Sequence, residues 1–267
     1  MPDPTGHAAG PAPLVPDLRA RLAAGEFLVG TWLTFLDPSV AELLAGSGYD
    51  FLVVDMEHGV ADAAHLQTFC IAARAGGSAV LARIGANEPV RIMHALDVGA
   101  SGVIVPQIRS VADVERAVAW CRYPPEGTRG AAARRPSGYG RKTREYFAIA
   151  DATVLCCVQI ETQEALDIIE DILAVPGVDA LLIGPNDLAA ALGHLGETGH
   201  ADVESAVADV RERALRRGMP IGFVSASPDP APAVARRDQG FSFVTVGVDF
   251  AFLAAGADAA VAAVRQG

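Results

Sequence analysis

The chain has 267 residues and a formal net charge of -11 at pH 7, and its composition is 51% hydrophobic and 20% charged. A chain of this length and polarity can bury a large core, which excludes an intrinsically disordered protein and allows a single α/β barrel domain. The acidic balance excludes nucleic acid and anionic membrane surfaces as partners, because both bind basic faces, but it leaves anionic small molecules open.

The N-terminal segment 1–16 is rich in Pro, Gly and Ala. It has neither the basic start nor the apolar run of a signal peptide, and no apolar run in the chain approaches the roughly 18 residues of a membrane span. We therefore predict a flexible tail over 1–16, a catalytic domain over 17–267 and a cytoplasmic protein.

Short apolar runs alternate with longer amphipathic stretches along the rest of the chain. The runs are rich in Val, Ile and Leu and apolar on both faces, as expected of parallel strands that are covered by helices. They predict strands at 28–33, 51–56, 79–84, 102–107, 153–161, 180–184, 220–226 and 243–249. The stretches between them predict helices that include 63–75, 110–121, 165–175 and 201–217.

Eight strand–helix units are the count of a (β/α)8 TIM barrel, which we predict as a single α/β domain. The alternative is an open doubly wound sheet, but no predicted strand is followed by the GxGxxG turn of a dinucleotide site. In a barrel the chemistry lies at the C-terminal ends of the strands, so functional residues are sought there.

One excursion, at 123–150, interrupts this alternation between the fourth and fifth strands. Its length, basic side chains and Gly and Pro residues predict a lid or an assembly element. The only lysine of the chain, Lys142, lies in it and not on a strand. A Schiff-base enzyme holds its lysine rigidly in the pocket, so we expect neither a lysine-dependent aldolase nor a pyridoxal phosphate enzyme.

The four cysteines show no CxxC spacing. We predict core thiols in a reducing compartment, with metal ligands or disulfides as the alternative. Cys156 and Cys157 are adjacent in an apolar run, so their side chains should point to opposite faces of one strand.

Polar residues gather at the predicted C-terminal ends of the strands. Among them, Glu161 and Asp187 are carboxylates after neighbouring strands, and such oxygens suit Mg²⁺ or Mn²⁺. The alternative is helix capping, since Asp187 opens an apolar helical run. The whole set is Asp55, Glu57, His58, Arg83, Gln107, Gln159, Glu161, Asn186, Asp187 and Asp249.

Two further residues of this set favour catalysis. His58 follows a buried strand and two carboxylates, where an imidazole can move protons near neutral pH, although a structural role is the alternative. Arg83 ends an apolar strand, and a buried cation needs an anion, either a substrate or a protein carboxylate. Asp97, in the following helix, is the candidate for a plain ion pair with Arg83.

Several segments together resemble the HpcH/HpaI family of divalent-metal-dependent class II pyruvate aldolases, typified by 4-hydroxy-2-oxo-heptane-1,7-dioate aldolase. The resemblance runs from about residue 17 to the C-terminus with the motifs in order. The segments are GTWLTFLDPSVAELLAGSGYDFLVVDMEHG, VLARIG, LDVGASGVIVPQ, RYPPEGTRG, VQIE and GPNDLAAALG.

The resemblance implies a role for each matching residue. Glu161 of VQIE and Asp187 of GPNDL match the metal-binding acids, and His58 of DMEHG matches the catalytic base. Arg83 matches the arginine that stabilises the enolate, and Asp97 matches the acid that raises the basicity of the histidine. The positions that match substrate contacts are Gln159 and Asn186, with Trp32 and Asp55 as further pocket residues. Many family members have a small residue where this chain has Asn186.

The resemblance also implies a reaction. It is the reversible aldol cleavage of a 4-hydroxy-2-oxo acid to pyruvate and an aldehyde, through a pyruvate enolate bound to Mg²⁺, Mn²⁺ or Co²⁺. The family further implies a homo-oligomer, a trimer or a hexamer, with an exchanged C-terminal helix. The Ala-rich segment 251–265 is suited to such packing.

Two other functions remain open at this point. One is an acyl-CoA lyase of the citrate lyase β and malyl-CoA lyase type. The acidic balance and the GPNDL motif instead favour the branch of the family that acts on free acids. The other is a barrel that binds a 2-oxo acid without lyase activity, which the intact acid, base and arginine positions disfavour.

Overall fold

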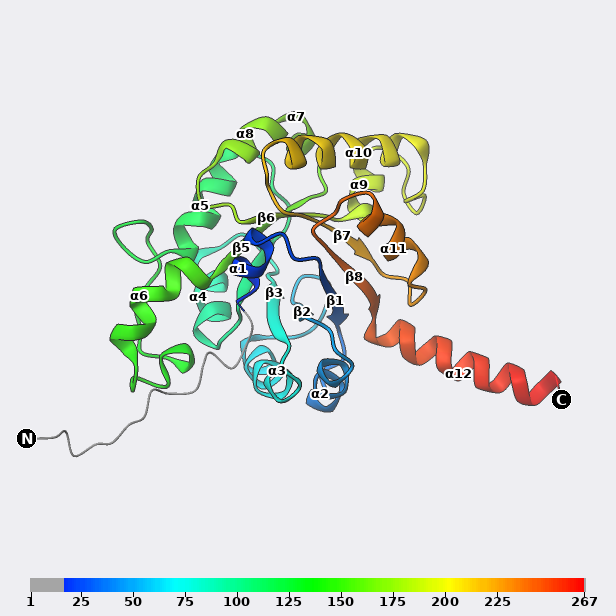
Figure 1. The fold of residues 1–267 in the computed structure, drawn as a ribbon, viewed down its shortest axis with the longest axis horizontal. Helices are drawn as coiled ribbons and strands as arrows, with labels where there is room; N and C mark the ends of the chain where they lie inside the picture. Colours follow the sequence, from blue (N-terminus) through cyan, green and yellow to red (C-terminus); the bar gives the residue numbers. More distant parts are fainter. Residues whose placement is uncertain (1–16, 267) are drawn as a thin grey trace, which may run out of the picture.

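The computed structural model describes residues 17–266 and forms a closed barrel of eight parallel strands that pair in sequence order (Figure 1). The predicted (β/α)8 fold is confirmed, and no strand boundary differs from its prediction by more than two residues. The predicted tail at 1–16 lies outside the described residues. The strands are β1 (Leu28–Leu33), β2 (Phe51–Asp55), β3 (Ala79–Arg83), β4 (Gly102–Val105), β5 (Leu155–Ile160), β6 (Ala180–Ile183), β7 (Ile221–Ser225) and β8 (Phe243–Val248).

Helices surround the barrel, and several begin at a side chain that accepts a bond from a helix amide, such as Asp37, Asp62, Ser110 and Thr162. The predicted helix at 165–175 is wrong in one respect, because Ile168 leaves the helical conformation and divides it into two. The helices are α1 (Leu18–Ala23), α2 (Pro38–Gly46), α3 (Ala63–Gly76), α4 (Pro89–Asp97), α5 (Val111–Cys121), α6 (Thr143–Thr153), α7 (Gln163–Asp167), α8 (Ile169–Ala174), α9 (Pro185–Ala191), α10 (Ala201–Arg216), α11 (Ala231–Asp238) and α12 (Asp249–Gln266), with a 3₁₀ turn at Arg135–Ser137.

The core has two layers, as a barrel requires. Inward side chains fill the barrel, and outward side chains pack against the helices. Cys157 belongs to the inner layer and Cys156 to the outer one, and all four cysteines are buried free thiols, which confirms that they are core residues and that the two neighbours point to opposite faces. Leu18 and Leu22 of α1 join the inner layer and close the N-terminal end of the barrel.

The excursion at 123–150 connects α5 to the start of β5. It therefore lies at the N-terminal end of the barrel. It does not cover the C-terminal ends of the strands of its own chain, so the prediction of a lid over that site is wrong. Arg129 bonds Asp97 at 2.9 Å, and Arg135 bonds the carbonyl of Val98, so the excursion packs beside the end of α4. Lys142 is an exposed residue at the start of α6, off the barrel as predicted.

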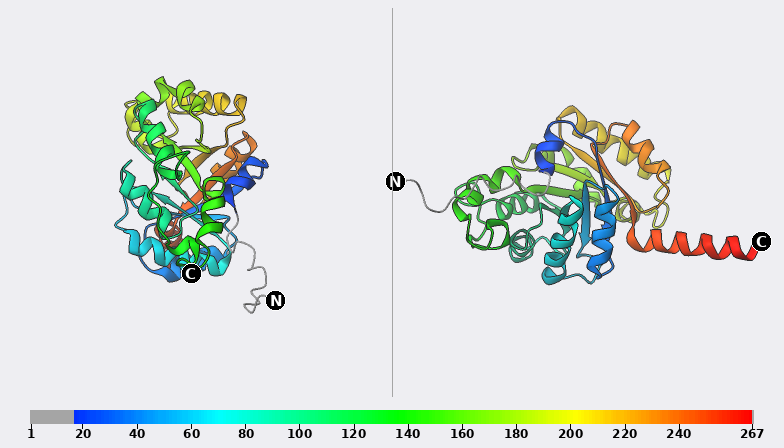
Figure 2. Two further views of the ribbon diagram at one scale, coloured as in Figure 1. Left: turned by 90° about the vertical axis from the view of Figure 1, so that its left-hand side faces the viewer. Right: turned by 60° about the horizontal axis from the view of Figure 1, so that its bottom comes forward.

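The C-terminal helix α12 projects away from the barrel (Figures 1 and 2). Phe250, Leu253, Val261 and Val264 on it are between 49% and 82% exposed. No helix within residues 17–266 is long and apolar enough to cross a bilayer.

Candidate active site

A cavity of about 320 Å³ lies at the C-terminal ends of the strands, where barrel chemistry is expected. It collects most of the predicted site residues from β1, β2, β3, β5 and the start of α9. Those that line it are Trp32, Asp55, His58, Arg83, Gln159, Asn186 and Asp187.

The cationic side of this cavity is Arg83, at the end of β3. Its Nε and Nη2 donate to the two carboxylate oxygens of Asp55 at 3.1 and 2.6 Å. Its guanidinium lies 4.5 Å from the ring centre of Trp32, which is itself held by a 2.8 Å bond to Thr245. The alternative of a plain Arg83–Asp97 pair is wrong, and Arg83 is instead fixed in the cavity wall.

Asp55 is buried at the end of β2. Burial raises the pKa of its carboxyl group, but the bonds from Arg83 and from the amides of Glu57 and His58 outweigh burial, so the pKa lies below its ordinary value. The same two amide bonds shape the turn that presents His58 to the cavity. Asp55 therefore positions both Arg83 and His58.

Glu161 follows β5 and is buried. Its Oε1 accepts bonds from the amide and the side chain of Gln107 at 2.8 and 3.2 Å, and its Oε2 accepts one from Gln159. Burial raises the pKa of its carboxyl group above the ordinary value. A Cβ on Gly184 would lie 2.8 Å from the ends of both the Glu161 and the Gln159 side chains, so a larger residue at this position would displace these two groups.

Asp187 and His58 face each other across the cavity mouth. The distance from His58 Nε2 to Asp187 Oδ2 is 4.0 Å, and the two side chains are 61% and 40% exposed. Asp187 stands in the first turn of α9, whose N-cap is Gly184 and which has no side-chain capping bond. The capping alternative for Asp187 is therefore wrong, and its carboxylate is available to the cavity.

Glu57 was predicted at a strand end but without a role. Its side chain is 10% exposed, and its Oε2 lies 3.5 Å from Arg83 Nε without a hydrogen-bond partner. Burial raises its pKa to about 7, Arg83 opposes this, and Glu161 and Asp187 add to it. The available signal was its place in the chain, because Glu57 lies between two other polar residues of the site, Asp55 and His58, directly after a buried strand.

Glu57→Gln is expected to raise the Tm of the metal-free protein at pH 8 by several degrees and to leave it unchanged near pH 4.5. The pKa of Glu57 is about 7 in the folded protein, above the ordinary value of 4.5. The free energy of unfolding therefore falls as the pH rises from 4.5 to about 7, by on the order of 2 kcal/mol in total. Glutamine cannot ionise and escapes that loss. The measurement is a thermal melt in EDTA at both pH values. The exposed Glu115→Gln is the control, and equal Tm differences at both pH values would contradict the expectation.

Asp97 is not brought to this site within one chain. It ends α4, just before the N-terminal end of β4, while His58 follows the C-terminal end of β2. The two residues therefore lie at opposite ends of the barrel. Asp97 is instead paired with the buried Arg129. Gln107 was also given no role, and it contributes the two bonds that hold Glu161.

The donor set fits a hard divalent cation. The charges of Glu161 and Asp187 raise the pKa of Glu57, the charge of Asp187 raises that of Glu161, and one oxygen of Glu57 is buried without a hydrogen-bond partner. Oxygen donors with excess negative charge are what Mg²⁺ and Mn²⁺ prefer. Glu161 and Asp187 are thus suited to hold such an ion, with Glu57 beside them.

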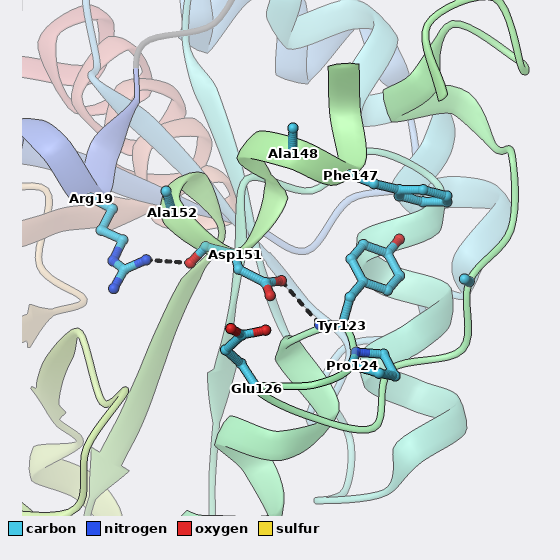
Figure 3. A pocket seen from close by; sticks show the side chains of 9 residues that line it. Arg19, Tyr123, Pro124, Glu126, Phe147, Ala148, Asp151 and Ala152 are labelled. Carbon is cyan, nitrogen blue, oxygen red and sulfur yellow. Dashed lines mark hydrogen bonds between the residues drawn. The ribbon is translucent and has the colours of Figure 1, made fainter. Parts of the chain in front are cut away.

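A larger cavity of about 720 Å³ lies at the other end of the barrel, between α1, the excursion and α6 (Figure 3). Its polar groups bond one another, since Arg19 donates to the carbonyl of Asp151 and the carboxylate of Asp151 accepts from the amide of Tyr123. These bonds hold the excursion against α1 and α6, and the candidate catalytic groups are those at the C-terminal ends of the strands.

Comparison with known proteins identifies the family of this chain. The family model described as HpcH/HpaI aldolase/citrate lyase matches residues 28–255. The chain is 39% identical over 238 residues to a 2-dehydro-3,6-dideoxy-6-sulfogluconate aldolase of Pseudomonas putida, covering 89% of this chain and 92% of the relative. It is 38% identical over 240 residues to a 5-keto-4-deoxy-D-glucarate aldolase of Shigella boydii, with the same coverages.

A solved structure is similar over nearly the whole chain. It is that of an HpcH/HpaI aldolase/citrate lyase family protein from Burkholderia cenocepacia, with a TM-score of 0.89 and 38% identity. The match covers 93% of this chain and 98% of that one. The chain therefore belongs to the HpcH/HpaI aldolase/citrate lyase family and is a carbon–carbon lyase.

Proposed function

We propose that this chain catalyses the reversible aldol cleavage of a 4-hydroxy-2-oxo acid to pyruvate and an aldehyde, with the help of a divalent cation. The observation that carries the proposal is the convergence of Glu161, Asp187, Arg83 and His58 on one rim. The names of the two sugar-acid aldolases support the substrate class, since both act on carboxylated sugar derivatives.

The cation would be held by Glu161 and Asp187, and when bound it would supply a Lewis acid for the 2-oxo acid. Arg83 supplies a fixed positive charge for the oxygen that becomes the enolate, and Asp55 holds that charge in place. Trp32 stacks on the guanidinium and limits its movement.

His58 is placed to move the proton of the reaction. In the cleavage direction, Nε2 of His58 takes the proton of the C4 hydroxyl, whose carbon becomes the aldehyde. The C3–C4 bond breaks, and the electrons of that bond form the enolate. Protonation of C3 then completes pyruvate. In the synthetic direction His58 removes a proton from the pyruvate methyl group. Gln159 and Asn186 line the same cavity and would contact the pyruvyl group.

Release of pyruvate from a 4-hydroxy-2-oxo acid tests this function. We expect turnover with Mg²⁺ or Mn²⁺ and a loss of at least 90% of it after EDTA, restored by adding the ion back. Equal rates with and without EDTA would overturn the metal mechanism. Turnover that requires a coenzyme A thioester would place the protein with the acyl-CoA lyases. Binding of pyruvate without turnover of any aldehyde would make it a non-lyase barrel.

We also propose that the chain assembles into a homo-oligomer, a trimer or a hexamer, through α12. The projecting helix exposes Phe250, Leu253, Val261 and Val264, and a second copy of the chain is the partner that would cover them. In such an assembly, Asp97 of one copy could approach His58 of another copy, which it cannot do within one chain.

Leu253→Asp with Val264→Asp is expected to lower the mass in solution from a multiple of 27.6 kDa to a smaller species. The charges would be desolvated in the interface, which disfavours association. Light scattering on the full chain measures this. Leu215→Asp on α10 is the control at an exposed apolar residue outside α12. A monomeric unsubstituted protein would contradict the assembly.

A further inference from the structure

A second cluster of metal-binding side chains lies in the loop between α9 and α10, outside the site described above. One nitrogen each of His194 and His200 and one oxygen of Glu197 lie within 4.8 Å of one another. The two imidazole rings are stacked, with 3.5 Å between their centres and 17° between their planes. We propose that these three side chains bind a divalent transition-metal ion of the Zn²⁺ type.

The loop is folded so that residues three apart along the chain converge. Gly193 and Gly196 have φ values of +82° and +84°, which glycine adopts without strain. The amide of Glu197 donates to the carbonyl of His194, and the amide of His200 donates to that of Glu197, both at 2.9 Å. These successive turns place the three side chains on one side of the loop.

Asp202 lies beside both rings, and its carboxylate can orient the ring of His194. Its Oδ2 is 2.9 Å from Nε2 of His194 and 3.6 Å from Nδ1 of His200. A carboxylate that accepts the proton of one ring nitrogen leaves the lone pair of the other for a cation, as behind many metal-binding histidines. Nδ1 of His200 accepts a 3.2 Å bond from the amide of Asp202, so the neutral ring carries its proton on Nε2, and a cation would take the Nδ1 lone pair in place of this bond.

The donor set selects the class of ion. Two imidazoles and a carboxylate suit Zn²⁺, whereas Mg²⁺ prefers oxygen ligands alone. Ligand atoms about 2.0–2.2 Å from a tetrahedral zinc lie roughly 3.3 Å apart. A metal lies in the plane of each imidazole that binds it, so the two stacked rings would turn out of their parallel arrangement to close the cluster. The His194 and His200 side chains are 23% and 34% exposed, so an ion can enter from solvent.

The position of the loop gives the ion a structural effect near the active site. Thr198 and Gly199 line a cavity of about 500 Å³. This cavity shares Pro185, Asn186 and two residues of the β7 end with the cavity of the active site. An ion bound to the loop would fix the wall beside the site and tie the end of α9 to the start of α10.

Zinc binding by the full chain, without an affinity tag, tests the proposal. The background is Glu161→Gln with Asp187→Asn, so that the active-site donors do not contribute. Equilibrium dialysis is expected to find about one tightly bound Zn²⁺ per chain in this background. Adding His194→Gln and His200→Asn is expected to weaken this binding by roughly a hundredfold or more. Asparagine at 200 keeps a side-chain acceptor for the Asp202 amide, so α10 retains a cap.

The control is His65→Gln, which breaks another exposed histidine–aspartate pair, with Asp62 at 2.7 Å, and should leave zinc binding unchanged. Circular dichroism checks that each variant is folded. Zinc retained after substitution of both loop histidines, or absent from the background protein, would overturn the loop site. Because no turnover is measured, this result is independent of the lyase proposal, which the pyruvate assay decides.

Discussion

Replacing Glu161 by glutamine is expected to lower kcat/KM for pyruvate release by roughly a thousandfold, because a bound metal contributes several kcal/mol of charge stabilisation. The substitution keeps the size of the side chain and removes one negative charge from the donor set. The bonds from Gln107 can still be accepted by the amide oxygen. Gln159 has an unbonded Oε1, so reversal of its amide can accommodate the new NH₂ group.

Two measurements separate this effect from a loss of structure. Titration with Mn²⁺ is expected to show weaker binding to the variant, and its melting curve should remain cooperative. Glu164→Gln is the matched control, since Glu164 lies three residues further on and pairs with Arg109 at the surface. A Glu161→Gln enzyme with unchanged turnover and unchanged Mn²⁺ affinity would show that the site assignment is wrong.

Arg83→Lys is expected to lower kcat by about a hundredfold to a thousandfold, the usual cost of losing one fixed group that stabilises developing negative charge. Lysine keeps the charge but has no planar fork, so it cannot make both bonds to Asp55 and stack on Trp32 at once. The charge then moves within the cavity. Since the enolate forms only during the reaction, kcat should fall more than KM rises.

Steady-state kinetics with the 4-hydroxy-2-oxo acid measure both constants for this variant. Arg109→Lys is the control, because this arginine follows β4 at the same end of the barrel but pairs with Glu164 in solvent. Asp55→Asn is a companion variant that should lower kcat less, since Asp55 positions Arg83 and does not supply the positive charge. A change in KM alone for Arg83→Lys would indicate that Arg83 only binds the substrate.

The elements of the fold follow from local patterns, which is why the sequence predicts them well. A strand covered on both faces needs a continuous apolar run, and all eight runs became strands. The helix at 165–175 shows the limit, because the apolar pattern continues through Ile168 while the backbone there leaves the helix. Periodicity records which side chains are buried, not every backbone angle between them.

The partners of the site residues were less predictable. Arg83 was expected to need an anion, and the named ion-pair candidate was Asp97, although Asp55 also stands at a strand end. The register of β2 against β3, which sets Asp55 directly opposite Arg83, decided between them. Glu57 and Gln107 likewise gained a role only once their neighbours Arg83 and Glu161 were placed.

By itself, the sequence determined the number of strand–helix units, the polar residues at the strand ends and the absence of a lysine from the strands. These properties depend on residues close together in the chain. Only the tertiary structure decided which residues lie together at the same end of the barrel. A connection that leaves a helix for the next strand must return to the N-terminal end. The excursion and Asp97 therefore lie opposite His58, while Glu161, Asp187 and Glu57 converge on the rim where metal chemistry is proposed.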